Sequence, residues 1–276
     1  MKVVITWGSG FLWKHLVRLY YEKWYKVISC QRKKIPEIEE ITYKYFDYTL
    51  PINIDADFQN VEIFIHCGSC TDYTALKKYM LQQNVASLRN IKKISSSAKH
   101  FIYISSSSVY QWIWWKISAD IVIDENNLQN SYSYSKFKAE EYIKNNFKNK
   151  YISILRPRAI YGDGDTTLIP QVLKNSIFWY LLLPGDGNSK TSISNIDELC
   201  NYTLNISQNN NWGIYNFSSE IQSYDQIYKK IQSDYGKRGI MYVPLWVVMV
   251  GYYFNRNKYS YIIDTFWKDK ILKTDK

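Results

Sequence analysis

Residues 3–13 read Val-Val-Ile-Thr-Trp-Gly-Ser-Gly-Phe-Leu-Trp, and this stretch sets the pattern of the N-terminal half of the chain. Val3 to Ile5 are β-branched, as in a buried strand, and Phe11 to Tyr21 place apolar residues at helical spacing. A second strand pattern follows at Lys26 to Cys30. The sequence therefore predicts a strand, a turn, a helix and a second strand parallel to the first.

The alternation of strands and helices continues beyond this unit. We expect buried strands at Val61 to His66, His100 to Ser105 and Tyr151 to Leu155. Helical spacing recurs near Ala75 to Ile94 and Ser135 to Phe147. Apolar strands separated by helices predict a parallel sheet that is covered on both faces. We therefore expect an α/β fold, with a Rossmann-type doubly wound parallel sheet and a small C-terminal substrate-binding lobe.

The stretches outside this alternating pattern predict loops, one apolar helix and the location of the protein. Thr42 to Asp57 and Ser207 to Asn211 are expected to be ordinary loops. The longest apolar run, Val243 to Phe254, is about a dozen residues long, fewer than the roughly 18 that cross a bilayer, so we expect a buried helix there. Met1 and Lys2 lead directly into the first strand without a signal peptide, which predicts a cytoplasmic protein.

Composition narrows the classes of function. With 276 residues, 46% of them hydrophobic, the chain can bury a large core as one domain. The formal net charge of +10 has two interpretations: scattered lysines in a chain rich in Asn, Ile and Tyr, or a surface that attracts phosphate-bearing ligands. No motif combines aromatic and basic residues on a recognisable reading element, so nucleic acid is not an expected partner.

The four cysteines are typical of a reduced chain. Cys67 and Cys70 form a CxxC motif, but no second pair supplies the other ligands of a zinc site, and no redox-type helix start follows. We expect structural thiols and no metal.

The turn between the first strand and the first helix is the first candidate site. A dinucleotide-binding fold needs glycines there, because the backbone must approach a pyrophosphate at the helix N-terminus. Of the glycines in the expected pattern TGxxGxxG, only Gly10 is in place. The residues of this candidate site are Thr6, Trp7, Gly8, Ser9, Gly10, Phe11 and Leu12.

A second motif lies in the middle of the chain. Residues 101–110 form a strand pattern that ends in four serines, and Tyr132 precedes Lys136 at YxxxK spacing on a predicted helix start. One helical turn brings both side chains to one face. A free tyrosine has a pKa of about 10, so Tyr132 acts as a base near neutrality only if a cation lowers that value. Lys136 is the candidate cation, and a serine hydroxyl would hold the substrate oxygen.

Together these motifs resemble the extended short-chain dehydrogenase/reductase family, the relatives of nucleotide-sugar epimerases and dehydratases, over nearly the whole chain. The resemblance implies an NAD(P)-binding Rossmann domain at residues 1–160 and a substrate-binding portion at residues 161–276 that partly returns to the Rossmann sheet. It implies a small-molecule substrate, no membrane span and the possibility of a homodimer. The matching segments are the first turn, Phe64 to His66, Asn84-Val85, residues 105–110, Tyr132 to Glu140, Leu155 to Gly162 and Ile214 to Asn216.

The resemblance also implies roles for single residues. Ser106, four residues before Tyr110, corresponds to the catalytic serine, and Tyr132 corresponds to the acid/base. Lys136 corresponds to the partner of that tyrosine and to a ribose contact.

Further cofactor contacts follow from the same resemblance. Asp47 stands where the family places an adenine contact, and Pro157 stands where the backbone meets the nicotinamide. Asn84 is also a candidate contact, although it could instead bind only backbone. His66 is expected to be structural.

The choice of cofactor depends on the end of the second strand. This strand has no Asp or Glu where a ribose-binding carboxylate would be, and Arg32, followed by two lysines, could contact a 2′-phosphate. This favours NADP over NAD, while a solvated basic turn is the alternative interpretation.

The tryptophans form an unusual pattern. Two hypotheses explain it: the codons are UGA triplets that the source organism reads as glycine, or the chain is a degenerated pseudoenzyme. We favour recoding, because random decay would not place one residue type at the family's glycines. If tryptophan is really present in the first turn, the indole of Trp7 would obstruct the pyrophosphate. The indole of Trp13 would displace the helix from the sheet. The family has glycine at Trp7, Trp13, Trp24, Trp212 and Trp267, and predicted turns or loops contain Trp112, Trp114, Trp115 and Trp179.

The reaction type follows only in part. The family's 4,6-dehydratases have an acidic pair directly after the catalytic hydroxyl, where this chain has Ser107 and Ser108, so dehydration is disfavoured. We expect hydride transfer at a secondary alcohol or ketone, as net oxidoreduction or epimerisation, on a nucleotide sugar or related small molecule. A non-catalytic NAD(P)-binding sensor or scaffold is the alternative, although binding alone needs no phenolate.

Overall fold

Seven parallel strands form the main sheet of the computed structural model, which describes residues 1–6, 10–32, 38–148, 151–209 and 212–274. The strand order is β12-β7-β5-β4-β1-β2-β3, and each neighbouring pair is parallel. This is a Rossmann-type sheet, as the sequence predicts. Its strands are β1 (Lys2–Thr6), β2 (Lys26–Gln31), β3 (Thr42–Tyr45), β4 (Ile63–His66), β5 (His100–Ile104), β7 (Tyr151–Pro157) and β12 (Gly213–Phe217).

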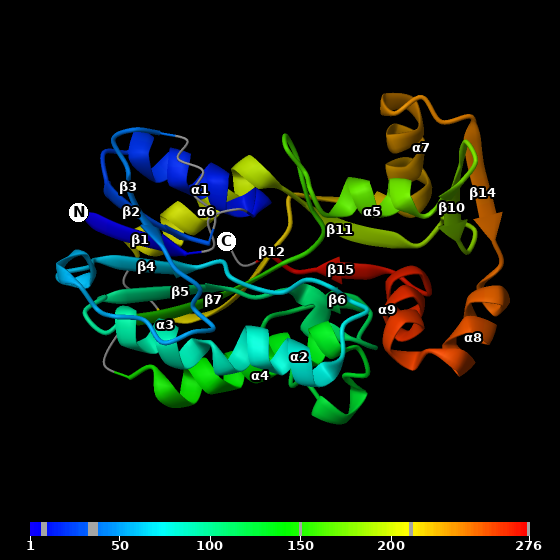
Figure 1. The fold of residues 1–276 in the computed structure, drawn as a ribbon. Helices are drawn as coiled ribbons and strands as arrows, with labels where there is room; N and C mark the ends of the chain where they lie inside the picture. The colour runs from blue at the N-terminus through cyan, green and yellow to red at the C-terminus, as the bar shows by residue number, and fades with distance from the viewer. Residues whose placement is uncertain (7–9, 33–37, 149–150, 210–211, 275–276) are drawn as a thin grey trace.

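Helices cover both faces of this sheet (Figure 1). On one face lie α1 (Phe11–Glu22) and α6 (Ile196–Gln208), and on the other lie α2 (Lys77–Leu81), α3 (Leu88–Ile94) and α4 (Ser131–Asn146). A π-helical turn, η2 (Gln82–Ala86), joins α2 to α3. The central strands are apolar on both sides because both sides are buried, and Val4 and Ile5 are fully inaccessible.

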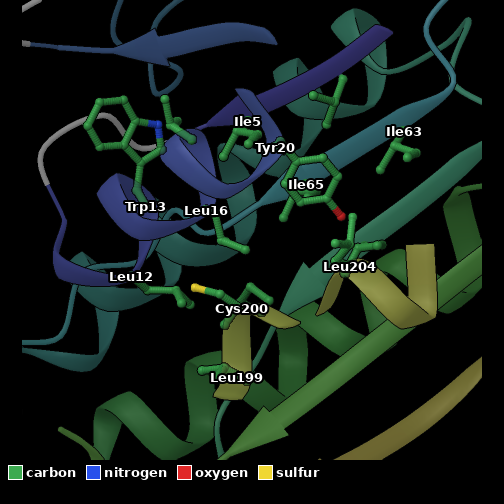
Figure 2. Packing of buried hydrophobic residues seen from close by; sticks show 14 of the residues in the cluster. Ile5, Leu12, Trp13, Leu16, Tyr20, Ile63, Ile65, Leu199, Cys200 and Leu204 are labelled. Atoms are coloured by element: carbon green, nitrogen blue, oxygen red, sulfur yellow. The ribbon is translucent and has the colours of Figure 1, made fainter. Parts of the chain in front are cut away.

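The apolar face of α1 packs between the sheet and α6. Figure 2 shows Leu16 and Tyr20 of α1 near Ile5 and Ile65 of the sheet, with Leu204 of α6 close by. The Tyr20 hydroxyl also donates a hydrogen bond to Ser207 Oγ at 2.8 Å. This packing places the N-terminus of α1 beside the carboxyl ends of the central strands, where a doubly wound fold binds its ligand.

The remaining elements lie mainly at the end of the molecule away from the N-terminus (Figure 1). One sheet has the order β13-β11-β15-β6, with β8 paired to β11, and a smaller sheet has the order β14-β10-β9. Their bounds are β6 (Trp115–Ile117), β8 (Ile160–Tyr161), β9 (Ser176–Ile177), β10 (Tyr180–Pro184), β11 (Lys190–Asn195), β13 (Glu220–Ser223), β14 (Gly239–Val243) and β15 (Lys270–Leu272). The helices are η1 (Ala56–Phe58), η3 (Ser107–Tyr110), η4 (Glu125–Asn127), α5 (Leu168–Lys174), α7 (Tyr224–Asp234), α8 (Leu245–Phe254) and α9 (Arg256–Phe266).

The structure corrects three expectations. The predicted loop at Thr42 to Asp57 contains strand β3, which pairs with β2 at the sheet edge, where polar residues are tolerated. Ser207 and Gln208 continue helix α6, whereas Asn210 and Asn211 lie outside the described residues.

The third correction concerns the apolar run. Helix α8 forms there, but Val248 is its only buried residue, so the expectation of a buried helix was wrong. Trp246 is 66% exposed, and Tyr253 and Phe254 are more than 80% exposed. Among the described residues, no helix has the length and apolar character to cross a membrane.

Candidate active site

The predicted catalytic residues come from two neighbouring elements. Ser106 follows β5, and Tyr132 and Lys136 lie one turn apart on α4. Helix α4 begins here because Oδ1 of Asn130 accepts hydrogen bonds from the backbone N–H groups of Tyr132 and Ser133, at 3.0 and 3.3 Å. This N-cap fixes Tyr132 in the first turn of the helix.

Tyr132 is buried and contacts the predicted serine. Burial raises the pKa of its phenol well above the ordinary value, while hydrogen bonds with the hydroxyls of Ser106 and Ser69 lower it. Ser106 also caps η3, because its Oγ accepts the backbone N–H of Ser108 at 3.1 Å. The structure therefore brings Ser106 and Tyr132 together, and it adds Ser69, which no sequence pattern singled out.

Lys136 is buried near the ring of Tyr132. Its Nζ donates a hydrogen bond to the carbonyl oxygen of Ile104 at 2.9 Å and lies 6.0 Å from the centroid of the Tyr132 ring. Burial lowers the pKa of Lys136 to about 7, against the opposing effects of Cys67 and Glu140. No second hydrogen bond joins its ammonium to the described part of the chain, so two of its three N–H donors are free for a ligand.

Two further tyrosines line the same site. The Tyr73 ring, in the loop after β4, lies 4.9 Å from the Tyr132 ring and 4.2 Å from the Tyr261 ring of α9, centroid to centroid. The hydroxyls of Tyr73 and Tyr261 are 3.3 Å apart. Sequence reasoning missed both residues, because the chain has 26 tyrosines and no local pattern marks these two.

The described part of the α1 start carries no acidic residue that would repel an anion. Gly10 is its N-cap, the cap has no side-chain hydrogen bond, and no acidic residue lies in the first turn. The side chains of Phe11 and Leu12, two further residues of this candidate site, are buried. The other predicted residues of this turn, Trp7, Gly8 and Ser9, lie outside the described residues.

Thr6 and His66 form a buried polar contact at the ends of β1 and β4. Thr6 Oγ1 lies 2.6 Å from His66 Nδ1. Burial, aided by the charge of Lys136, lowers the pKa of His66 to about 3 and keeps the ring neutral. This geometry agrees with a structural histidine rather than a base.

Arg32 and Asp47, the predicted phosphate and adenine contacts, are neighbours. Arg32 Nη1 lies 3.9 Å from Asp47 Oδ2, and both side chains are partly exposed. Asp47 Oδ1 also accepts hydrogen bonds from the backbone N–H and the hydroxyl of Thr49, at 2.8 and 2.7 Å. The carboxylate thus offsets part of the charge that Arg32 would offer a 2′-phosphate.

Asn84 and Pro157 differ in what they contact. Asn84 Oδ1 accepts from the backbone N–H of Cys70 at 2.7 Å, and its Nδ2 donates to the Cys70 carbonyl and to Ser135 Oγ. Asn84 therefore holds the loop after β4 against α4, because it bonds both the backbone of Cys70 and the hydroxyl of Ser135. Pro157 is buried at the carboxyl end of β7, paired with Phe217.

Several tryptophans occupy unusual backbone conformations. Trp24, Trp112 and Trp115 have φ values of 62°, 64° and 70°, in the left-handed region that favours glycine and is rare for bulky residues. Trp13, by contrast, is helical and only 1% exposed. Its ring is accommodated at the start of α1, which still packs on the sheet, so the expected displacement of the helix was wrong (Figure 2).

Comparisons with known proteins identify relatives of this chain. The family model described as Male sterility protein matches residues 53–201, more than half of the chain. The 2-alkyl-3-oxoalkanoate reductase of Stenotrophomonas maltophilia is 27% identical over 71% of this chain, and the 3-beta-hydroxysteroid dehydrogenase of Mycolicibacterium neoaurum is 25% identical over 72%. The match spans only 62% and 58% of these two relatives.

A solved structure shows the same fold. The UDP-glucuronic acid 4-epimerase from Bacillus cereus, in complex with NAD, superposes with a TM-score of 0.73 at 21% identity, covering 88% of this chain and 87% of the epimerase. The sheet order and the family model lead to one assignment. The chain belongs to the extended short-chain dehydrogenase/reductase family, in the part of it described by the Male sterility protein model.

Proposed function

We propose that the chain catalyses NAD(P)-dependent hydride transfer at a secondary alcohol or ketone, with Ser106, Tyr132 and Lys136 as its catalytic residues. The observation that supports this best is the contact of Tyr132 with Ser106 beside a buried ammonium. A phenol bonded to hydroxyl groups and placed near a cation is suited to move a proton to or from a substrate oxygen.

The three residues divide the proton chemistry between them. In the oxidation direction Ser106 holds the substrate hydroxyl, and Tyr132 takes its proton as a phenolate. The charge of Lys136 stabilises that phenolate through space. In the reduction direction Tyr132 returns the proton to the carbonyl oxygen. A bound nicotinamide supplies the hydride acceptor or donor.

The described residues fit such a cofactor. The uncapped N-terminus of α1 offers backbone N–H groups to a pyrophosphate, and the free N–H donors of Lys136 suit ribose hydroxyls. Pro157 lies at the same sheet edge. A preference for NADP requires that Arg32 exchanges its ion pair with Asp47 for a contact with the 2′-phosphate.

The proposed substrate is a nucleotide sugar or a related small molecule. One curated relative is named as a reductase of an oxoalkanoate, and the other is named as a dehydrogenase of a hydroxysteroid. The structural neighbour is named as an epimerase of UDP-glucuronic acid. Both net oxidoreduction and epimerisation use the same proton and hydride steps. We also propose that the chain forms a homodimer and that it acts in the cytoplasm.

A non-catalytic NAD(P)-binding sensor or scaffold is the second candidate. The buried Trp13 favours it, because this indole occupies a family glycine position without disrupting the core. The contact of Tyr132 with Ser106 opposes it, since binding alone needs no acid or base.

The test compares two tyrosines of one helix. NADH and NADPH oxidation is followed with 3-oxo acids, 3-ketosteroids and UDP-4-keto sugars, using the unmodified chain, Tyr132→Phe and Tyr134→Phe. Tyr132→Phe should lower kcat by about 100-fold or more, as expected for loss of a general acid. Tyr134, whose hydroxyl bonds Glu125, serves as the control and should retain turnover. Full activity in Tyr132→Phe would remove the proposed mechanism.

A further inference from the structure

Arg158 is a buried cation that the proposed proton chemistry does not use. It follows β7 and is 8% exposed. Its Nε donates a hydrogen bond to Thr191 Oγ1 at 2.7 Å, and its Nη2 donates to the Tyr224 hydroxyl at 3.2 Å. Both partners are neutral, and no carboxylate of the described residues forms an ion pair with it. Buried charges in proteins are normally paired, so this guanidinium is unusual.

The neighbouring charges do not compensate Arg158. Lys270, which is fully buried, forms an ion pair with Asp264, and that pair is neutral as a whole. The pKa of Lys270 falls to about 8, first through burial and further through the charge of Arg158, while Asp264 opposes the shift. These three side chains therefore leave one uncompensated positive charge inside the protein.

The charge of Arg158 acts electrostatically on two tyrosines of the candidate active site. Burial raises the pKa of Tyr73 and of Tyr261, and Arg158 acts against that rise in both. Tyr73 contacts Tyr132 directly through its ring. Tyr73 and Tyr261, whose rings stack on each other, thus respond to the guanidinium charge, and Tyr73 also contacts the ring of Tyr132.

We propose that Arg158 binds an anionic group of the substrate whose alcohol or ketone is held at Tyr132, an inference that rests on the proposed function. Thr191 and Tyr224 occupy two of the five N–H donors of the guanidinium, which leaves three. Those three donors can form two parallel hydrogen bonds with a carboxylate or a phosphate. The hydroxyl of Tyr224 can add a donor of its own. The substrate class is then an anionic alcohol or ketone.

Arg158 could instead only connect the end of β7 to β11 and α7, so the test needs a readout that a structural contact does not change. Acetoacetate, 4-oxopentanoate and 5-oxohexanoate are compared with their methyl esters as acceptors of hydride from NADH and NADPH. Each pair has the same ketone and differs in charge, and the series varies the distance between ketone and carboxylate.

The unmodified chain should prefer the acid over its ester at the best length. Hydrogen bonds to charged groups contribute about 1.5–3 kcal/mol, which corresponds to roughly 10- to 100-fold in kcat/KM. Arg158→Gln should bring the ratio of kcat/KM for the acid to kcat/KM for its ester down toward 1, and Arg158→Lys should restore part of this ratio. Arg256→Gln, which removes an exposed guanidinium on α9, is the matched control. Equal rates for acids and esters in the unmodified chain would overturn the role of Arg158 and leave the proposed function intact.

If no ketone is reduced, a binding experiment tests the anion site at Arg158 separately from the proposed hydride transfer. Calorimetry with glutarate and with UDP measures anion binding without any reaction, and it distinguishes a carboxylate site from a diphosphate site. Binding of one anion that is lost in Arg158→Gln and kept in Arg256→Gln would support the site while the hydride-transfer proposal failed. Absence of binding by both anions would overturn it.

Discussion

The ammonium of Lys136 donates a hydrogen bond to the carbonyl oxygen of Ile104 at 2.9 Å, and this contact ties α4 to the end of β5. Ser106, the proposed catalytic serine, follows that strand, so this hydrogen bond connects the two elements that supply the candidate site. The charge of Lys136 is consequently held near Tyr132 at a cost, because a buried ammonium loses its hydration.

That cost predicts a specific pH dependence of stability. Since the pKa of Lys136 is about 7 in the folded chain and 10.5 in an ordinary lysine, the unfolded state binds more protons between these values. The free energy of unfolding should therefore gain a contribution from Lys136 as pH rises from 7 toward 10. Lys136→Met should be more stable than the unmodified chain at pH 7, and this difference should shrink by pH 9.

Urea unfolding at four pH values between 6 and 9 measures this difference. Lys270→Met is a useful comparison, because the pKa of Lys270 is also lowered by burial, to about 8. A constant difference between the unmodified chain and Lys136→Met at all four values would show that the lysine is not desolvated as described.

The ion pair of Arg32 and Asp47 predicts how the nucleotide preference changes. Asp47→Asn removes the charge that offsets Arg32 and should improve NADPH binding relative to NADH by a few-fold, the size expected for a partly exposed charge pair. Arg32→Gln should weaken NADPH and leave NADH unchanged. Calorimetric titration of both nucleotides decides this, and identical NADPH affinities in the two variants would exclude a 2′-phosphate contact at Arg32.

The backbone of Trp24 predicts a stabilising substitution. Its φ of 62° is strained for a residue with a Cβ, and its side chain is 93% exposed, so it loses no packing on removal. Trp24→Gly should raise the free energy of unfolding by about 1 kcal/mol. Trp246→Gly is the matched control, because this exposed tryptophan is helical and its replacement should cost about 1 kcal/mol. Destabilisation by Trp24→Gly would contradict the strain argument.

The recoding hypothesis predicts the residues of the native protein. Peptides from protein isolated from the source organism should have glycine at positions 24, 112 and 115, where φ is positive, and also at positions 7 and 13. Mass spectrometry reads these positions directly. A native N-terminal peptide with tryptophan at 7 and 13 would contradict the recoding hypothesis.

Local patterns predicted the centre of the sheet and the helix that carries Tyr132 and Lys136. The β-branched run at Val3 to Ile5 and the spacing of Tyr132 and Lys136 are short-range features, and both are found as expected. Tyr73 and Tyr261 could not be found in this way, because only the tertiary fold brings them together with Tyr132.

Burial was also difficult to predict from composition. The apolar run of α8 has the hydrophobicity of a core helix, yet the structure leaves most of it exposed. Strand β3 has alternating polar residues that resemble a loop, and only its pairing with β2 identifies it. Both features depend on neighbours that are distant in the sequence.

The central claim, a nicotinamide dinucleotide bound beside Tyr132, is tested most directly by calorimetric titration of NADH and NADPH. Three chains are compared: the sequence as it stands, the double variant Trp7→Gly with Trp13→Gly, and that double variant with Lys136→Met added. The account predicts that the double variant binds a dinucleotide, that the unmodified chain binds it more weakly, and that loss of Lys136 lowers the affinity. Failure of all three chains to bind either nucleotide would contradict the account.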